Sequence, residues 1–210
     1  MAVVRLSGIR FSYGTTPVLT GVDLEVAAGE CVGLAGPNGA GKTTLLSIIS
    51  TLTRPSAGAG EVLGAELGTD RVRYVRPSIG WSGHEPALYD ELTLSENLAH
   101  FARLAGRDRS EADRVLDQVG LAAAASRRAD RSSNGMRRRA DLARLLMLEP
   151  RLVLFDEVHA GLDAGAGVIV DAIAERALTS GGAVVMVSHD ADHLKRRTDR
   201  VLELTDGRLT

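Results

Sequence analysis

Hydrophobic and polar residues follow three different patterns along this chain. In residues 3–6 and 22–26 apolar and polar positions alternate, which is typical of strands with one exposed face. From about residue 85 to 149 the apolar positions recur at helical spacing. Short apolar runs at 30–35, 152–155 and 183–187 have no polar alternation, which favours strands buried on both faces.

These patterns predict an α/β fold with a parallel or mixed sheet, an N-terminal antiparallel β subdomain and an inserted helical subdomain. We expect one domain over residues 1–210, with a core formed by 1–84 and 150–210 and a helical subdomain at 85–149. Within the helical subdomain, Ser95 and Ser110 are predicted to cap two helices, and Gly120 is predicted to end the second.

Residues 36–44 read Gly-Pro-Asn-Gly-Ala-Gly-Lys-Thr-Thr, between a predicted strand and a predicted helix. The glycines let successive backbone N–H groups turn toward one point, where they and the helix N-terminus bind anionic oxygens. This is the phosphate-binding loop of a nucleotide site, and a chance glycine-rich turn would not need both flanking elements. The predicted nucleotide-binding residues are Gly36, Pro37, Asn38, Gly39, Ala40, Gly41, Lys42, Thr43 and Thr44. Lys42 would reach the β and γ phosphates, and Thr43 offers a hydroxyl to Mg²⁺.

The apolar run at 152–155 ends in two carboxylates, Asp156 and Glu157. A buried strand would deliver Asp156 to Mg²⁺, usually through water, and would place Glu157 beside the γ phosphate as a general base for the attacking water. Taken alone, the two acids could simply mark the end of a strand. The phosphate-binding loop favours the catalytic interpretation.

Residues 132–136 read Ser-Ser-Asn-Gly-Met and precede a basic, then apolar, helical segment. This segment resembles the signature motif of ATP-binding cassette (ABC) ATPases, usually Leu-Ser-Gly-Gly-Gln, and Ser133 precedes Asp156 by the 23 residues customary in that family. Ser133 and Gly135 match the motif, whereas Ser132, Asn134 and Met136 depart from it. The resemblance implies that Ser133 and Gly135 bind the ATP of an opposite subunit, although such residues can also serve only as a helix cap.

Further elements of the ABC family follow in order. Tyr13 resembles the aromatic residue that stacks on adenine, and residues 160–163 (Ala-Gly-Leu-Asp) resemble the loop that signals between subunits. His189 resembles the switch histidine, which would contact the γ phosphate and orient the attacking water. The resemblance extends from about residue 3 to the end, and it implies the ABC ATPase fold with a phosphate-loop NTPase core.

His84 stands where most family members carry a glutamine that touches Mg²⁺ and the attacking water. An imidazole can also bond water or metal, but His84 could instead only pack the hinge between the core and the helical region. His84 and the Ser-Asn-Gly-Met signature are similar to the ATP-binding subunit of the haem exporter of cytochrome c maturation, the CcmA subfamily. That similarity does not explain Val158, where the family commonly has proline.

Composition adds limits to these expectations. The chain has 210 residues, 44% hydrophobic content and a formal net charge of −2, which disfavours an extensive nucleic-acid surface. No apolar run approaches the roughly 18 residues of a membrane span, and the N-terminal pattern is not that of a secretory signal. We therefore expect a cytoplasmic protein, peripheral on the inner face of the cell membrane. The single cysteine, Cys31, is expected to be buried.

The resemblance therefore implies an ATPase subunit of an ABC transporter that uses ATP and Mg²⁺. It implies a head-to-tail dimer, either a homodimer or a heterodimer with a second ABC ATPase, that powers a separate transmembrane permease. The similarity to the CcmA subfamily implies that the transported substrate is haem. No nucleic-acid partner is expected. The alternatives are the ATPase of an unrelated efflux system, a soluble ABC ATPase acting on DNA or ribosomes, and a regulatory subunit that hydrolyses ATP poorly.

Overall fold

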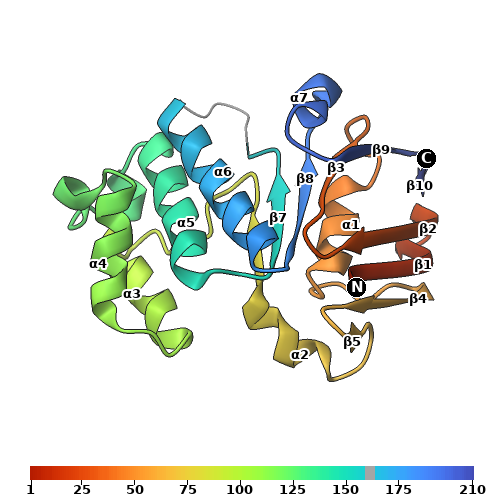
Figure 1. Cartoon of the computed structure of the whole chain (residues 1–210), viewed down its shortest axis with the longest axis horizontal. Coiled ribbons are helices and arrows are strands. Elements are labelled where there is room, and N and C mark those ends of the chain that lie inside the picture. Colours follow the sequence, from red (N-terminus) through yellow and green to blue (C-terminus); the bar gives the residue numbers. More distant parts are fainter. Residues whose placement is uncertain (159–163) are drawn as a thin grey trace.

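The computed structural model of the chain describes residues 1–158 and 164–210. A six-stranded sheet in the order β10-β9-β3-β8-β7-β6 forms its centre, and a four-stranded antiparallel sheet in the order β2-β1-β4-β5 lies to one side. The helices α3 to α6 cover the other side (Figure 1). The predicted α/β architecture, with a separate antiparallel sheet and a mixed central sheet, is therefore confirmed.

The strands are β1 (Ala2–Tyr13), β2 (Thr16–Ala27), β3 (Cys31–Ala35), β4 (Ala57–Val62), β5 (Ala65–Glu66), β6 (Ile79–Ser82), β7 (Leu152–Asp156), β8 (Ala183–Val187), β9 (Arg200–Thr205) and β10 (Arg208–Leu209). The α-helices are α1 (Lys42–Ile49), α2 (Val72–Val75), α3 (Leu94–Leu104), α4 (Arg109–Gln118), α5 (Asn134–Leu148), α6 (Ala164–Thr179) and α7 (Ala191–Lys195). Short 3₁₀ turns occupy Arg76–Ser78, Ala122–Ala124 and Ala129–Arg131.

The central sheet separates two hydrophobic cores. On β7, Val153 and Phe155 pack into the core shared with α3 to α6, whereas Leu152 and Leu154 pack into the core shared with α1, β1 and β2. Successive strand residues point to opposite faces, so a strand covered on both sides has to be apolar throughout. This is why the sequence shows continuous apolar runs for β3, β7 and β8.

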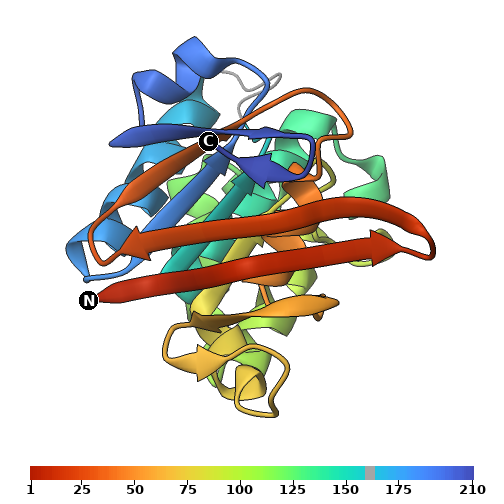
Figure 2. The same ribbon diagram turned by 90° about the vertical axis from the view of Figure 1, so that its right-hand side faces the viewer.

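The antiparallel sheet presents one face to the second core. Figure 2 shows its two long strands, β1 and β2, crossing in front of the strands of the central sheet. On β1, Val4 pairs with Val26 of β2 and with Val62 of β4, and all three side chains are fully buried. Arg5, the next residue along β1, is exposed. The alternation in the sequence therefore corresponds to one buried and one exposed face.

The helices α3, α4 and α5 pack against one another, but the first two begin earlier than predicted. The N-cap of α3 is Thr93, not Ser95: its hydroxyl accepts from the Glu96 N–H at 3.1 Å, and the Glu96 carboxylate accepts from the Thr93 N–H at 2.8 Å. This reciprocal pair is a capping box. The N-cap of α4 is Asp108, whose carboxylate accepts from the Ser110 N–H at 2.8 Å. Both serine predictions were wrong by two residues, because Thr93 and Asp108 cap the two helices upstream of Ser95 and Ser110.

The predicted end of α4 at Gly120 is confirmed. Gly120 has φ +70°, and its N–H donates to the Asp117 carbonyl at 2.9 Å, while the Leu121 N–H donates to the Leu116 carbonyl at 2.7 Å. This pair of bonds is a Schellman motif, which glycine favours because it adopts positive φ without strain.

Across 1–158 and 164–210, no helix is long and apolar enough to cross a membrane.

Candidate nucleotide-binding site

The order of the central strands brings distant motifs together. β3, β8 and β7 are parallel neighbours, so their carboxyl ends meet at one edge of the sheet. The phosphate-binding loop follows β3. Asp156 ends β7 and Glu157 comes directly after it, while His189 follows β8. Ligands bind at this kind of edge in open α/β sheets.

The phosphate-binding loop depends on glycine at defined positions. Gly36 has φ +144°, and a Cβ there would lie 2.3 Å from the Leu204 carbonyl oxygen, so no other residue fits without moving β9. Gly41 has φ +102° and directly precedes α1. Because Gly41 has no side chain to cap the first turn of α1, the N–H groups of that turn stay available to an anion. These features agree with the predicted phosphate site.

Lys42 is the first residue of α1 and is only 7% exposed. Its Nζ donates to the carbonyls of Gly36 at 2.7 Å and Pro37 at 2.9 Å. The ammonium is thus held within the loop, where it can meet phosphate oxygens brought to the N-terminus of α1.

Thr43 and Asp156 meet although 113 residues separate them. The Thr43 hydroxyl donates to Oδ2 of Asp156 at 2.8 Å. Burial raises the pKa of the Asp156 carboxyl, with a smaller rise from Glu157, while the Thr43 hydrogen bond, Lys42 and His84 act in the opposite direction. A hydroxyl and a carboxylate side by side are the hard oxygen donors that Mg²⁺ prefers. A bound cation would offset the free-energy cost of burying the Asp156 negative charge. These two residues therefore fit a Mg²⁺ site.

Glu157 and His189 form a second pair at the same edge. His189 Nδ1 lies 3.0 Å from Glu157 Oε2, with the glutamate side chain 23% exposed and the histidine side chain 67% exposed. Glu157 has φ +53°, an unfavourable value for a non-glycine residue, and its N–H donates to the Val187 carbonyl of β8 at 3.0 Å. Backbone strain of this kind is found at functional sites, where surrounding contacts hold it. Val158, the next residue, is fully buried in the core beside α5 and α6.

A cavity of about 340 Å³ lies between the phosphate-binding loop and the end of β7. It is lined by Tyr13, Val18, Asn38, Gly39, Gly41, Lys42, Thr43, Thr44, Asp156 and Glu157. Tyr13 is 61% exposed and meets Phe11 edge to face at 4.9 Å between ring centroids, so a ring face remains open to a planar ligand. Val18 was not predicted from the sequence, because it joins the site only where β2 folds back along β1.

The two predicted signature residues lie elsewhere. Ser133 is the N-cap of α5, and its hydroxyl accepts from the Met136 N–H at 3.3 Å. Gly135 lies in the first turn of α5, and apart from its chain neighbours and the backbone of its own helix no atom lies within 4 Å of where a Cβ would be. α5 is on the opposite side of the central sheet from α1 (Figure 1), and neither residue lines the cavity described above. Within one chain, the structure does not bring the signature to the phosphate-binding loop.

His84 lies on the exposed segment after β6 and is near enough to Asp156 to lower the pKa of its carboxyl. The segment that carries His84 leaves β6 after Ser82, which pairs with Phe155, the residue before Asp156, although His84 does not line the cavity. The predicted signalling loop at 160–163 lies outside the described residues.

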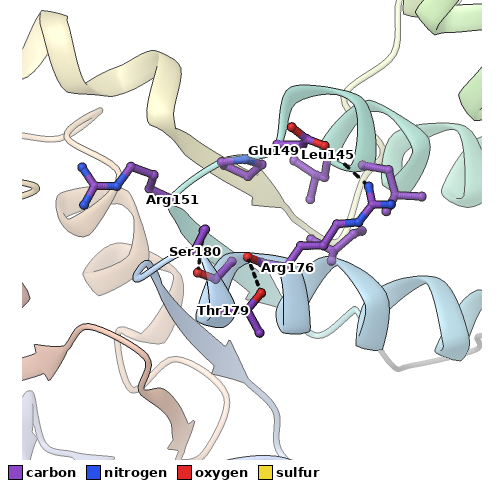
Figure 3. A pocket seen from close by; sticks show the side chains of 10 residues that line it. Leu145, Glu149, Arg151, Arg176, Thr179 and Ser180 are labelled. Carbon is purple, nitrogen blue, oxygen red and sulfur yellow. Dashed lines mark hydrogen bonds and ion pairs between the residues drawn. The ribbon is translucent and has the colours of Figure 1, made fainter.

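A separate cavity of about 530 Å³ lies between the end of α5 and α6. Figure 3 shows Arg176 of α6 reaching toward Glu149, with 3.7 Å between Arg176 Nη1 and Glu149 Oε1. Leu145, Arg151, Thr179 and Ser180 are among the other residues around it. None of the predicted site residues lines this cavity.

Comparison with known proteins identifies the family of the chain. Residues 19–160 match the family model described as "ABC transporter". The chain is 39% identical over 215 residues to a daunorubicin resistance ATP-binding protein of Streptomyces coeruleorubidus, over 98% of this chain and 66% of the relative. It is 40% identical over 221 residues to the lipoprotein-releasing system ATP-binding protein LolD of Anaeromyxobacter dehalogenans, over 98% of this chain and 92% of the relative. The chain thus spans about two thirds of the first relative and nearly all of the second.

Solved structures agree with this result. An ATP-binding subunit of an ABC transporter superposes with a TM-score of 0.89 at 29% identity, over 99% of this chain and 88% of that chain. A dimeric ATP-binding cassette in a post-hydrolysis state, bound to ADP and Pi, superposes with a TM-score of 0.84 at 26% identity, over 98% and 96% of the two chains. The ABC ATPase fold is thereby confirmed, and the chain belongs to the family of ABC transporter ATP-binding proteins.

Proposed function

We propose that this chain is the ATP-hydrolysing subunit of an ABC exporter. The observation that carries the proposal is the meeting of the phosphate-binding loop, the Thr43–Asp156 pair and the Glu157–His189 pair at one edge of the central sheet. Each group has a separate task in ATP hydrolysis: the loop binds phosphates, the first pair suits Mg²⁺, and the second pair suits the attacking water.

The proposed site is completed by a second copy or by a related ATPase subunit. Ser133 and Gly135 start a helix on the far side of the sheet from α1, so within one chain they do not reach an ATP bound at the phosphate loop. A head-to-tail dimer would bring the α5 N-terminus of one subunit to the γ phosphate held by the other. The similar cassette bound to ADP and Pi is described as dimeric, which supports this arrangement.

In the proposed mechanism, Tyr13 stacks on the adenine while the loop amides and Lys42 bind the phosphates. Thr43 and Asp156 would hold Mg²⁺, which when bound neutralises charge on the β and γ oxygens. Glu157 accepts a proton from the attacking water, and His189, 3.0 Å away, orients that water and the carboxylate. Contacts between the γ phosphate and the α5 N-terminus of the opposite subunit exist only in the closed dimer, so hydrolysis removes the affinity that keeps the dimer closed.

The proposed partner is a transmembrane permease, with this chain bound to it at the inner face of the membrane. Export is supported by the names of the relatives, which refer to drug resistance and to lipoprotein release. Haem export is a narrower candidate, supported by His84 and the Ser-Asn-Gly-Met signature. Co-purification with the permease encoded beside this gene decides between them: a haem permease supports the narrower candidate, and a drug or lipid permease contradicts it.

ATP binding is tested by comparing Lys42→Ala with Lys195→Ala. Lys42 is buried in the loop, whereas Lys195, the other lysine of the chain, is 66% exposed and pairs with Asp192 on the surface. Losing charge-assisted contacts to phosphate lowers ATP affinity roughly 10²-fold in Lys42→Ala. Lys195→Ala binds as the parent does. Equal affinity in all three proteins, measured with a fluorescent ATP analogue, contradicts the proposed site.

A further inference from the structure

Three charged residues of α5 face the interior of the protein. Asp141 is fully buried, Arg144 is 8% exposed and Arg138 is 9% exposed. They are spaced three residues apart, so they share one face of the helix. That face is turned toward residues 81–87, the segment that leaves β6 and carries His84.

The Asp141 carboxylate contacts both ends of this segment. Its Oδ2 accepts from the Ser82 hydroxyl at 2.6 Å, and its Oδ1 accepts from the Ala87 N–H at 3.3 Å. Oδ1 also accepts from Nε and Nη2 of Arg144, at 3.1 and 2.7 Å. One buried side chain thus sets the distance between residues 82 and 87.

The two arginines hold the backbone on either side of Ser82. Nη2 of Arg144 donates to the Trp81 carbonyl at 2.8 Å. Nη1 of Arg138 donates to the Gly83 carbonyl and lies 3.5 Å from the Ser82 hydroxyl oxygen. The backbone immediately before His84 is therefore fixed by the helix that begins at Ser133.

Stability alone gives little reason for such a network. Burying these three charges costs desolvation free energy, and well-packed apolar residues in the place of a buried ion pair or triad are often as stable or more so. A fully hydrogen-bonded buried network does, however, specify one arrangement of the groups it joins. Here it joins the segment beside Asp156 to the helix that carries the signature residues.

We propose that Asp141, acting through Ser82 and Arg144, is a positioning residue that fixes the His84 segment to α5. It holds His84 near Asp156 and makes any displacement of segment 81–87 move the Ser133 end of the helix. The catalytic consequence rests on the proposed ATPase function, whereas the fixing of the segment does not.

The fixing of the segment is tested without nucleotide by hydrogen exchange and fluorescence. Trp81 is the only tryptophan in the chain, so its emission reports this segment alone. The variants are Asp141→Asn, which removes the charge but keeps the shape, and Ser82→Ala, which removes one hydroxyl. Leu116→Ala is the control, since Leu116 is fully buried in α4, away from the segment.

In both test variants, amide exchange over residues 83–88 quickens by roughly tenfold and the Trp81 emission shifts, because a bond to a buried carboxylate is lost. Leu116→Ala lowers the melting temperature without either change. If exchange and emission in Asp141→Asn and Ser82→Ala match the parent, Asp141 does not position the segment and the inference is overturned.

The catalytic consequence is tested by separating ATP affinity from turnover. Asp141→Asn and Ser82→Ala keep the ATP dissociation constant within about threefold and lower kcat about tenfold, since the phosphate loop is untouched while His84 is misplaced. Altered exchange with an unchanged kcat overturns the catalytic part. A parent protein that does not hydrolyse ATP contradicts the proposed function instead, and the exchange result still decides the positioning role.

Discussion

Replacing Glu157 by glutamine is expected to stop hydrolysis while leaving ATP bound. The Glu157 side chain lines the nucleotide cavity, and its Oε2 lies 3.0 Å from His189 Nδ1. Glutamine has the same size and can keep a hydrogen bond to the imidazole, but it cannot accept a proton from water. The variant therefore isolates the loss of the general base.

The size of the effect follows from that loss. A positioned general base contributes roughly 10²- to 10⁴-fold to a rate, or about 2.7 to 5.4 kcal/mol of activation free energy. ATP affinity stays within about threefold, because Lys42 and the loop amides carry it. Folding is not weakened, since removing the Glu157 charge relieves one of the causes that raise the Asp156 pKa. With ATP retained and hydrolysis blocked, the closed dimer accumulates.

The assays are single-turnover phosphate release and size-exclusion chromatography with ATP and Mg²⁺. Glu149→Gln is a matched control: Glu149 also has a left-handed backbone, with φ +50°, but it lines the cavity between α5 and α6. The control hydrolyses ATP as the parent does. Parental hydrolysis in Glu157→Gln would show that Glu157 is not the base, and a protein that elutes only as monomer would remove the support for the dimer.

Three further outcomes are expected. Burial raises the pKa of the Asp156 carboxyl, so the stability that this group contributes is present at low pH, where the carboxyl is protonated, and is lost as the pH rises through the raised pKa. Without Mg²⁺, the Asp156→Asn variant therefore melts at a higher temperature than the parent at neutral pH. A higher melting temperature that persisted below about pH 4 would contradict this reasoning. Burial raises the pKa of the Cys31 thiol to about 12, so a thiol reagent at about pH 8 is expected to label Cys31 only after the protein is denatured. Rapid labelling of the native protein would show that Cys31 is not buried. His84→Gln keeps ATP affinity within a few-fold and changes hydrolysis, and its dependence on pH and on the permease, more than binding; identical pH profiles in parent and variant would leave His84 only a packing role.

Several features of this protein could be predicted from the sequence because their causes are local. The phosphate-binding loop is one, since it depends on glycines that adopt positive φ and on a helix that starts directly after them. The end of α4 at Gly120 is another. The buried strands were also predicted, because a strand covered on both faces has to be apolar at every position.

The start of α3 was decided by a distant segment. The N–H groups of Leu94 and Ser95 donate to the carbonyls of Arg127 and Ala125 at 3.0 and 2.9 Å, so the helix begins at Leu94 and Thr93 becomes its cap. Both Thr93 and Ser95 are capable caps, and the sequence pattern alone does not choose between them.

Only the tertiary structure brought the chemistry together. Thr43 and Asp156 lie 113 residues apart, and they meet because β3, β8 and β7 are neighbours in the sheet, an order that sequence periodicity does not specify. Asp141 shows the same limit, since an acid within a basic helix is ordinarily expected on the solvated face. It is buried because Ser82, 59 residues earlier, and Arg144 satisfy its oxygens, and a buried charge is tolerated only where such partners are supplied by the fold.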